Sequence, residues 1–540
     1  MPTRILLTIL ACIMIRMPAP AQTVYHVARG AVGASDSNDG QTASLRGGHG
    51  PFKTIAAAVN ESGPGDQIII HPGDYRTEDS GWGAGAVGVS RSGTKSRPIR
   101  LAGVRDNMPI LGRLILDNCS WIEIRNLDFR NPNLNLPATW KPMPAMVTDS
   151  NSETIQIQYS EDWSVREKKI SQKFATYSSI IRDLEYDTAI DLRKVSNVSI
   201  QRCAIDGYWA GIQARGAANL QIESNRINRC VNGIFCWEPE PSIVNSVIRG
   251  NQFTQSFSNA IEVRKSANNV LIENNQIKFT GVNSINLREG STNCTVRGNQ
   301  ISHGGFYAGT MQYPGASAIN VHTAGKGNVV ENNHAYYQVD ETGADGNGII
   351  IDLMLDGASV IVRNNVCYRN IGAGINTTKS PNAIIVQNAL IENGYQATLP
   401  RQGYGIKFSR DDDTNQTVLN NILCNNRIAG IVGVQLLSKQ KQVDHNLYFS
   451  DKPTPLIWDG WEFGDREYRS LADLQKSNLA GAHSLYAKPA LVEQNGLITI
   501  GRTKEVVDTG LTHQHSASDI QSTERPIGKS TDIGLSLIHI

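Results

Sequence analysis

The chain has 540 residues, of which 19% are charged, and its formal net charge is +1. This near-neutral balance gives no sign of a globally basic nucleic-acid-binding protein or of an acidic tail. The length exceeds one average domain but is compatible with one elongated repeat domain.

The first residues are typical of a secretory signal. Arg4 supplies the positive charge, "ILLTILACIMI" the apolar segment, and "APA" at residues 19–21 a small-residue cleavage site. The apolar segment is too short to span a bilayer. We therefore predict a signal peptide over residues 1–21 and a protein secreted to the periplasm or the extracellular space, with no membrane partner.

Residues 22–110 are expected to form an N-terminal cap and the first rungs of a repeat. Within them, "GPFKTIAAAVNESGPGDQIIIHPGDYR" spans residues 50–76. Residues 52–59 predict a capping helix, "PGD" a turn, and "QIIIHPGDYR" a first strand. Residues from about 131 to 182 lack a regular pattern and predict an insertion or a pair of irregular rungs.

A repeat occupies residues 111–449. "LQIESNRI", "VLIENNQI" and "CTVRGNQI" each show an alternating apolar strand that runs into an asparagine and a second short strand. The repeated asparagines are Asn225, Asn251, Asn275, Asn299, Asn333, Asn365, Asn388 and Asn421, with spacings of 26, 24, 24, 34, 32, 23 and 33. A fixed period with insertions indicates a solenoid, and alternation favours strands over amphipathic helices. We predict a parallel β-solenoid with three short strands per rung and hydrogen-bonded asparagine stacks.

This pattern resembles that of the right-handed parallel β-helix proteins of the pectate lyase type. Residues 50–76 are also similar to the opening of many secreted β-helix proteins that act on polysaccharides. The resemblance covers residues 25–449. It implies an all-β, right-handed parallel β-helix with an N-terminal capping helix and an active groove on one sheet.

Residues 450–540 are expected to form a C-terminal extension with a short helix in "REYRSLADLQKS". The final "LSLIHI" has no place in the pattern, and we interpret it as read-through rather than a native ending. Eight cysteines are spread along the chain without a CxxC pair, and Cys12 lies in the signal. The other cysteines therefore predict buried thiols rather than a disulfide framework or a zinc site.

One strand of each rung begins with a small residue and an isoleucine, as in "NAIEVRK" and "SAINVHT". If the isoleucine points into the core, the next residue and the one two further on point outward. The first predicted outward column is Asp191, Gln213, Phe235, Glu262, Asn286, Asn320, Asp352, Asn376 and Lys407. The second is Arg193, Arg215, Trp237, Arg264, Arg288, His322, Met354, Thr378 and Ser409. Long loops before residues 319, 349 and 406 would wall this face and form a groove.

The second column indicates an acidic ligand. Arg264 and Arg288 would stack about 4.8 Å apart, and a bound anion would relieve their repulsion. Trp237 offers an apolar platform one rung away. We predict an acidic polysaccharide bound by Arg264, Trp237, Arg215 and Asn286, with no nucleic-acid partner, and a monomeric protein.

Cleavage of a uronate polymer by β-elimination needs a neutralised carboxylate, a base for the C5 proton and a donor to the leaving oxygen. His322 has the outward geometry of a neutral-pH base. Ca²⁺, which takes oxygen ligands, can neutralise the carboxylate. The segment "VDETGADGNGIIID" supplies the predicted calcium ligands Asp340, Glu341, Asp345 and Asp352, with Asn320 as a neutral ligand. Solvated loop acids with Asp-Gly turns are the alternative interpretation.

"EVRKS", followed one rung later by "NLREG", is similar to the chondroitinase B and alginate lyase type. That resemblance implies that Glu262 helps to bind calcium, Lys265 is the base and Arg288 assists proton delivery. The sequence departs from the type because only one acid precedes the lysine and Glu289 stands where a histidine would follow the arginine. An ordinary surface rung is the alternative.

We therefore predict a secreted polysaccharide-degrading enzyme, a calcium-assisted lyase of a uronic-acid-containing polysaccharide. A glycoside hydrolase on the same scaffold and a non-catalytic glycan-binding or adhesin solenoid are the alternatives. "RDDDTN", residues 410–415, is acid-rich, but we interpret it as a solvated turn because no Gly-His-Gly follows. The Asp-Pro-His-Asp run expected of a mannuronan C5-epimerase is absent.

Overall fold

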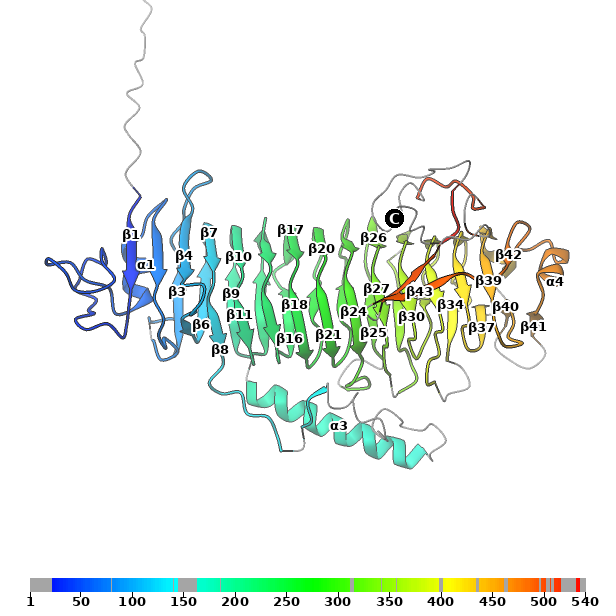
Figure 1. Ribbon diagram of the computed structural model, residues 1–540, viewed down its shortest axis with the longest axis horizontal. Coiled ribbons are helices and arrows are strands. Elements are labelled where there is room, and N and C mark those ends of the chain that lie inside the picture. Colours follow the sequence, from blue (N-terminus) through cyan, green and yellow to red (C-terminus); the bar gives the residue numbers. More distant parts are fainter. Residues whose placement is uncertain are drawn as a thin grey trace, which may run out of the picture.

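The computed structural model describes residues 22–78, 80–138, 140–143, 163–184 (side chains from 171), 186–310, 315–340, 342–355, 357–397, 402–433, 437–460, 465–494, 497–501, 506, 509–515 and 531–534. The predicted signal peptide and the predicted read-through end lie outside these residues. The chain winds into a long coil of short strands, with one long helix beside it and an extension near the C-terminal end (Figure 1).

Each turn of the coil contributes strands to three parallel sheets, which confirms the predicted parallel β-helix with three strands per rung. In the described part of the chain, sheets I, II and III have 15, 13 and 14 strands. Sheet I comprises β1 (Val24–Val27), β2 (Gln67–Ile70), β4 (Ile99–Gly103), β7 (Ser120–Arg125), β10 (Ser196–Gln201), β13 (Ala217–Ala218), β14 (Gln221–Glu223), β17 (Ile243–Arg249), β20 (Asn268–Glu273), β23 (Thr295–Arg297), β26 (Asn328–Glu331), β29 (Val360–Arg363), β32 (Ile384–Val386), β35 (Thr417–Leu419) and β38 (Gln442–Asp444).

Sheet II comprises β5 (Ile110–Leu111), β8 (Asp128–Arg130), β11 (Ala204–Asp206), β15 (Arg226–Asn228), β18 (Gln252–Ser256), β21 (Gln276–Thr280), β24 (Gln300–Gly304), β27 (His334–Tyr336), β30 (Val366–Tyr368), β33 (Ala389–Ile391), β36 (Ile422–Cys424), β39 (Leu447–Phe449) and β42 (Leu485–Tyr486). Sheet III comprises β3 (Ala86–Val89), β6 (Arg113–Asp117), β9 (Thr188–Arg193), β12 (Ala210–Arg215), β16 (Asn232–Trp237), β19 (Ile261–Val263), β22 (Ile285–Arg288), β25 (Ser317–His322), β28 (Asn347–Asp352), β31 (Ile375–Thr378), β34 (Tyr404–Phe408), β37 (Ala429–Gly433), β40 (Ile457–Asp459) and β41 (Arg466–Tyr468). β43 (Leu491–Gln494) and β44 (Leu497–Ile500) form a separate antiparallel hairpin.

The predicted capping helix is present as α1 (Ile55–Glu61). Thr54 accepts a hydrogen bond from the backbone N–H of Ala57 and so caps the first turn. The buried side chains of Ile55 and Val59 join the main core at the N-terminal end of the coil. The predicted first strand corresponds to β2, and β1, which the sequence analysis did not anticipate, pairs with it in parallel.

The irregular region contains α3 (Trp163–Leu184), so it is an insertion with a long helix rather than a pair of irregular rungs. Tyr177, Ile180 and Leu184 lie on one helical stripe and are buried. They pack in one cluster with Phe257 and Tyr307 of the coil. The helix therefore runs along the outside of the solenoid, as Figure 1 shows.

Buried asparagines connect successive rungs, as predicted, and the ladder continues one rung further, to Asn446. Each Nδ2 donates to the Oδ1 of the next asparagine at 2.9–3.1 Å. The same oxygen accepts the preceding rung's backbone N–H, as Asn299 does from Asn275. The left-handed corner itself is taken by the residue before the ladder asparagine, such as Asn274 with φ 55°.

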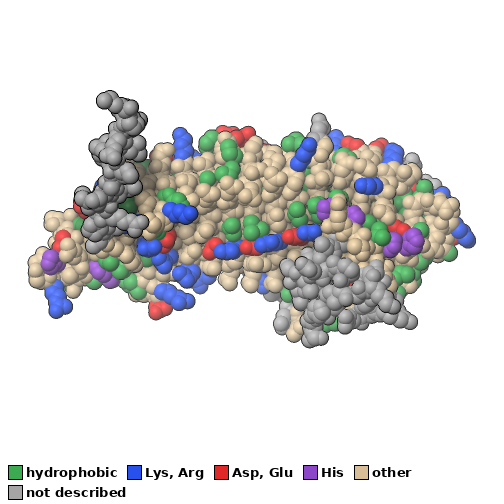
Figure 2. All heavy atoms as spheres, turned by 90° about the horizontal axis from the view of Figure 1, so that it is seen from above, with side chains coloured by type: hydrophobic (Ala, Val, Ile, Leu, Met, Phe, Trp, Pro, Cys, Tyr) green, Lys and Arg blue, Asp and Glu red, His purple; other side chains and the backbone are tan. Residues whose placement is uncertain are grey.

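Charges along sheet I alternate from rung to rung. Strand pairing aligns a column of Glu223, Arg249, Glu273, Arg297, Glu331 and Arg363. Arg249 contacts Glu223 at 2.7 Å and Glu273 at 3.7 Å, so this cation lies between two acids. Figure 2 shows such a line of alternating acidic and basic side chains along the molecule. Opposite charges at facing positions support this register.

The prediction of buried thiols is confirmed for the seven cysteines that the structure describes, which are all free and buried. Cys12 lies outside the described residues. Within the described ranges, no helix combines the length and the apolar character that a membrane span requires.

Substitution Asn299→Ala should lower stability strongly. It leaves the backbone N–H of Asn275 buried without an acceptor and removes one of the two acceptors of Asn275 Nδ2, which keeps only Ile248 O. Each unsatisfied buried donor costs about 1–3 kcal/mol. Urea unfolding followed by circular dichroism measures the loss. The control is Gln276→Ala, one residue beyond Asn275 at an exposed position of β21. Equal unfolding midpoints for the two variants would contradict a structural role for the ladder.

Candidate active site

The register of sheet III confirms the two outward columns over most rungs. In the first column, pairing aligns Asp191, Gln213, Phe235, Glu262, Asn286, Asn320, Ile350, Asn376 and Lys407. In the second, it aligns Arg193, Arg215 and Trp237, and further along Arg288, His322, Asp352 and Thr378. Arg264 follows Val263, the last residue of β19.

One rung was predicted in the wrong register. Ile349, not Ile351, pairs with Ile319 and Ile375, the anchoring isoleucines of the neighbouring strands, so Ile350 takes the first column and Asp352 the second. Met354, predicted for the second column, lies beyond β28 and packs partly buried against the core. Three consecutive isoleucines leave the core position ambiguous in the sequence, and the correction brings Asp352 beside His322.

The guanidinium groups of Arg264 and Arg288 both contact carboxylates of the protein, which relieves part of their mutual repulsion. Arg264 Nη1 contacts Glu262 Oε1 at 3.2 Å, and Arg288 Nη1 contacts the same oxygen at 3.6 Å. Arg264 also forms a two-pronged pair with Glu289. Glu262 is 1% exposed, and its other oxygen accepts from Asn259 Nδ2 at 2.7 Å. Burial raises the pKa of Glu262, while Arg264 and Arg288 oppose that rise.

Lys265 lies at a left-handed corner, with φ 58°, directly after this cluster. Its Nζ is 3.3 Å from Glu238 and 3.4 Å from Glu289. The hydrogen bond to Glu238 and the charge of Glu289 raise the pKa of Lys265. A lysine held protonated in this way suits neutralisation of an anion better than abstraction of a proton.

A pocket of about 620 Å³ lies over the N-terminal half of sheet III. Tyr177 and Ile181 of α3 form one wall, so the insertion encloses the sheet face on this side. Charged and polar side chains line much of the rest, and aromatic residues are interspersed among them: Tyr186, Trp209, Phe235 and Trp237. Phe235 stacks on Trp237 at 5.4 Å, and Arg264 lies 4.1 Å from the centre of the Trp237 ring.

The side chains predicted to bind substrate on these rungs already make contacts within the protein. Arg264 lies over the ring of Trp237 in a cation–π contact, so part of the ring surface predicted to bind substrate is already covered. Arg215 Nη2 contacts Asp191 at 2.5 Å, and Asp191 also binds Arg193 at 2.7 Å. Arg215 and Trp237 nevertheless line the pocket, where a ligand could reach them.

Arg288, His322 and Asp352 occupy successive rungs at the middle of the sheet. His322 Nε2 is 3.7 Å from Asp352 Oδ2, and its Nδ1 is 3.1 Å from Thr323 Oγ1. Burial, followed by the nearby charge of Arg288, lowers the pKa of His322. Burial, followed by the charge of Asp413, raises the pKa of Asp352 to about 6. At neutral pH the three side chains are therefore a cation, a neutral imidazole and a carboxylate.

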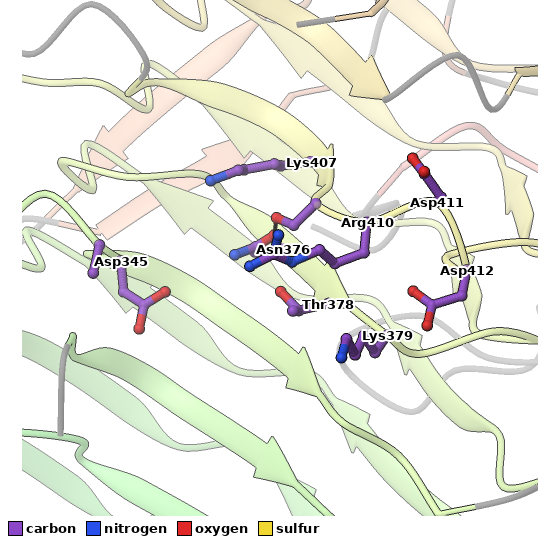
Figure 3. A pocket seen from close by; sticks show the side chains of 10 residues that line it. Asp345, Asn376, Thr378, Lys379, Lys407, Arg410, Asp411 and Asp412 are labelled. Atoms are coloured by element: carbon purple, nitrogen blue, oxygen red, sulfur yellow. Dashed lines mark hydrogen bonds between the residues drawn. The ribbon is translucent and has the colours of Figure 1, made fainter. Parts of the chain in front are cut away.

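A second pocket, of about 800 Å³, lies over the C-terminal half of sheet III. Asp345 lies on one side, with Asn376, Thr378 and Arg410 on the other (Figure 3). Burial and the charge of Asp340 raise the pKa of Asp345 to about 7, and Lys407 opposes the rise.

The sequence alone predicts no function for Lys407 and a solvated turn at residues 410–415. Asp411 and Asp412 in fact line this pocket. Asp413 is buried and accepts backbone N–H bonds from Ser380, Ser409 and Arg410, so it fixes the turn. Within a run of acidic residues, the sequence does not indicate which side chains line a pocket and which one fixes the turn.

The predicted calcium ligands do not converge. Both oxygens of buried Asp340 accept from its surroundings: Thr342, Asp345 N and Ala316 N. Glu262 is shared between two arginines, and Glu341 lies outside the described residues. Among the described residues, Asp340, Asp345 and Asp352 do not form a close group of three ligands. Asp340 and Glu262 thus do not fit a Ca²⁺ ion well, because cations or N–H donors occupy their oxygens.

Asn286, predicted to bind substrate, is buried on the rung between Glu262 and Asn320. Neither Oδ1 nor Nδ2 of Asn286 has a hydrogen-bond partner, and Asn320 Oδ1 has none. Buried amides of this kind are costly unless a ligand or water satisfies them. They therefore mark the middle of sheet III as a place where a polar ligand would gain hydrogen bonds.

The comparisons with known proteins bear on the fold. Residues 113–301 and 278–447 match the model of the family described as right handed beta helix region, so the chain belongs to that family and the predicted handedness is confirmed. No curated protein matches the chain.

Solved structures with the same fold are distant in sequence. The structure of XylC with xylose is 12% identical, with a TM-score of 0.52 over 96% of this chain and 98% of that chain. The PL6 family alginate lyase AlyGC is 16% identical, with a TM-score of 0.44 over 84% of this chain and 55% of that chain. A rhamnogalacturonan lyase is 11% identical, with a TM-score of 0.36 over 83% and 87%. The chain thus spans about half the length of the alginate lyase, and these likenesses concern the fold alone.

Substitution Glu262→Ala should destabilise the protein. It leaves Arg264 and Arg288 without their shared buried partner, and breaking a buried pair costs about 3–5 kcal/mol. Urea unfolding measures the change. Glu238→Ala is the matched control, because its contact to Lys265 involves a side chain that is 59% exposed, and such pairs contribute little. A loss no larger than that of the control would show that Glu262 does not balance the arginines.

Proposed function

We propose that this chain is a secreted, monomeric enzyme that cleaves a uronic-acid-containing polysaccharide by β-elimination on the face of sheet III. The alignment of Arg288, His322 and Asp352 on successive rungs supports this proposal most directly. The three side chains supply a cation for a carboxylate, a neutral base and an anion that stabilises the protonated base. His322 and Asp352 are 23% and 22% exposed at their side chains, so a sugar ring can reach them.

In the proposed reaction, the guanidinium of Arg288 pairs with the uronate carboxylate and stabilises the negative charge that develops at C5. His322 carries its hydrogen on Nδ1, toward Thr323 Oγ1, and Nε2 removes the C5 proton. The electrons of the C5–H bond form the C4=C5 double bond, and the C4–O4 bond breaks. The imidazolium, stabilised by Asp352, returns the proton to O4 of the leaving sugar.

This route uses one group as both base and acid. It therefore requires C5–H and C4–O4 on the same face of the ring, as in mannuronate and glucuronate. Lys265, Arg264 and Arg215 would bind neighbouring carboxylates, and Asn286 would bind a sugar hydroxyl. The two pockets on either side of His322 would hold the flanking sugars.

Calcium is a separate proposal. Because the predicted ligands do not converge, an ion would have to draw Asp345, Asp352 and the Asn320 amide oxygen together, and it would supply a second positive charge for the carboxylate. A chelator added to the activity assay tests this independently of the roles of His322 and Arg288.

A glycoside hydrolase is the second candidate, because one observation favours it. Asp345, with a pKa of about 7, keeps a protonated fraction at neutral pH, as a general acid requires. Asp352, the last residue of β28 on the same rung, adds its charge to the causes of that raised pKa and would then be the partner carboxylate. Hydrolysis yields new reducing ends without a double bond.

Activity should depend on the central column. We expect wild-type protein to release products with ultraviolet absorbance from polymannuronate or a glucuronate polymer, and none from polygalacturonate. His322→Ala and Arg288→Ala should each lower the rate by about 10²–10⁴-fold, the usual contribution of such groups. Lys278→Ala, an exposed cation of β21 on sheet II, is the control and should keep full activity.

Two results would overturn the lyase proposal. New reducing ends without ultraviolet absorbance would favour the hydrolase. Binding of the polymer without either product would favour a non-catalytic, glycan-binding solenoid. Loss of stability as the cause of inactivity is excluded by measuring the unfolding midpoint of each variant.

The pH dependence separates the lyase from the hydrolase. A base must be deprotonated, and the pKa of His322 is lowered from its ordinary value of 6.5, so kcat/KM should rise with pH through a value below 6.5 and then stay level. A hydrolase that uses protonated Asp345 should instead lose activity as the pH rises through about 7. Initial rates between pH 4 and pH 9 decide between these profiles, and His322→Ala should lack the acid limb.

A further inference from the structure

Two histidines and an aspartate meet at the C-terminal end of sheet I, away from the face of sheet III. Asp444 is the last residue of β38, His445 follows it in a left-handed turn with φ 52°, and His483 comes from the C-terminal extension. The two imidazole rings are stacked, with centroids 4.8 Å apart and planes 20° apart. Figure 2 shows histidine side chains gathered near acidic ones toward this end of the molecule.

The carboxylate of Asp444 is fixed by backbone groups. Its Oδ1 accepts N–H bonds from His445 and His483, both at 2.8 Å. Its Oδ2 therefore faces the two rings, at 2.8 Å from His483 Nδ1 and 3.5 Å from His445 Nδ1. Over the described residues, this is the one group of three His, Cys, Asp or Glu ligands whose donor atoms all lie within 4.8 Å of one another.

An ordinary hydrogen-bonded pair explains only one of the histidines. His483 Nδ1 can donate to Oδ2, but His445 Nδ1 is buried and has no hydrogen-bond partner. If His445 Nδ1 carries a lone pair, that lone pair lies close to a carboxylate oxygen, which is unfavourable. A cation between the two nitrogens and Oδ2 would turn this repulsion into three favourable contacts.

We propose that Asp444, His445 and His483 bind a divalent transition-metal ion of the Zn²⁺ class. Imidazole nitrogen and carboxylate oxygen are the ligands that Zn²⁺ takes, at about 2.0–2.2 Å, which places tetrahedral ligands about 3.3 Å apart. The observed 2.8 and 3.5 Å lie on either side of that spacing. Asp444 and His445 are 12% and 15% exposed at their side chains, whereas His483 is 68% exposed, so the ion enters from solvent and a water completes the site.

The proposed ion would fasten the C-terminal extension to the coil. Around the site, the extension is already joined to the last rungs by Gly481 N–H to Val443 O at 2.9 Å and by Asn446 N–H to Ser484 Oγ at 3.1 Å. Metal binding would add the stabilisation that any ligand of the folded state provides. This role is independent of the chemistry proposed for sheet III.

The test uses the full secreted chain without a histidine tag, stripped with a chelator and dialysed. Titration calorimetry with ZnCl₂ should give one equivalent bound, and CoCl₂ should give the visible absorption of a nitrogen- and oxygen-liganded ion. His483→Gln removes an exposed ligand with little risk to folding, and it should weaken Zn²⁺ binding at least about 10-fold. Wild-type protein should melt at a higher temperature with Zn²⁺ than without it, and His483→Gln should not.

His49→Ala is the matched control. His49 pairs with Asp39 in the same way but has no second histidine, so its loss should leave zinc binding unchanged. Absence of a bound equivalent, or equal binding by wild type and His483→Gln, would overturn the proposal. The proposal would also be overturned if the difference in melting temperature between wild type and His483→Gln were the same with and without Zn²⁺. The three residues would then form a hydrogen-bonded contact only.

Discussion

Hydrogen bonds between buried asparagines hold each rung in register with the next, and the positions of the functional side chains depend on that register. Each ladder oxygen accepts two donors from the preceding rung, so a slip would leave several buried donors unsatisfied. In-register parallel pairing then places equivalent residues of successive rungs side by side. Arg288, His322 and Asp352, far apart in the chain, become neighbours for this reason.

The same constraint forces charges into close columns, and the molecule compensates most of them. Sheet I alternates glutamate with arginine, and in sheet III Glu262 and Glu289 neutralise Arg264. At the middle and C-terminal rungs of sheet III, the charges are not simply paired, and the pKa values of the side chains are displaced instead. There His322 has a lowered pKa, while burial raises the pKa of Asp352 and Asp345 toward neutrality. Groups whose pKa values are displaced toward working pH are those that can transfer protons.

Much of the fold could be predicted because its signals are local and repeated. The asparagine spacing gave the rungs, and a single isoleucine per strand gave the columns wherever it stood alone. The three isoleucines of β28 removed that anchor, and Asp352 was assigned to the wrong column. The long helix α3 was missed because a single charged segment has no repeat, and its buried stripe is defined by partners such as Phe257.

The site was less predictable because its chemistry depends on contacts between rungs. Nothing in "EVRKS" shows that Asn259 and two arginines occupy the oxygens of Glu262, or that Glu238 and Glu289 hold Lys265. The most direct test of the account is a crystal structure of His322→Ala soaked with a mannuronate tetrasaccharide. We expect a sugar carboxylate on Arg288 and C5 facing the vacated position of residue 322. An oligosaccharide bound elsewhere, with none along sheet III, would contradict it.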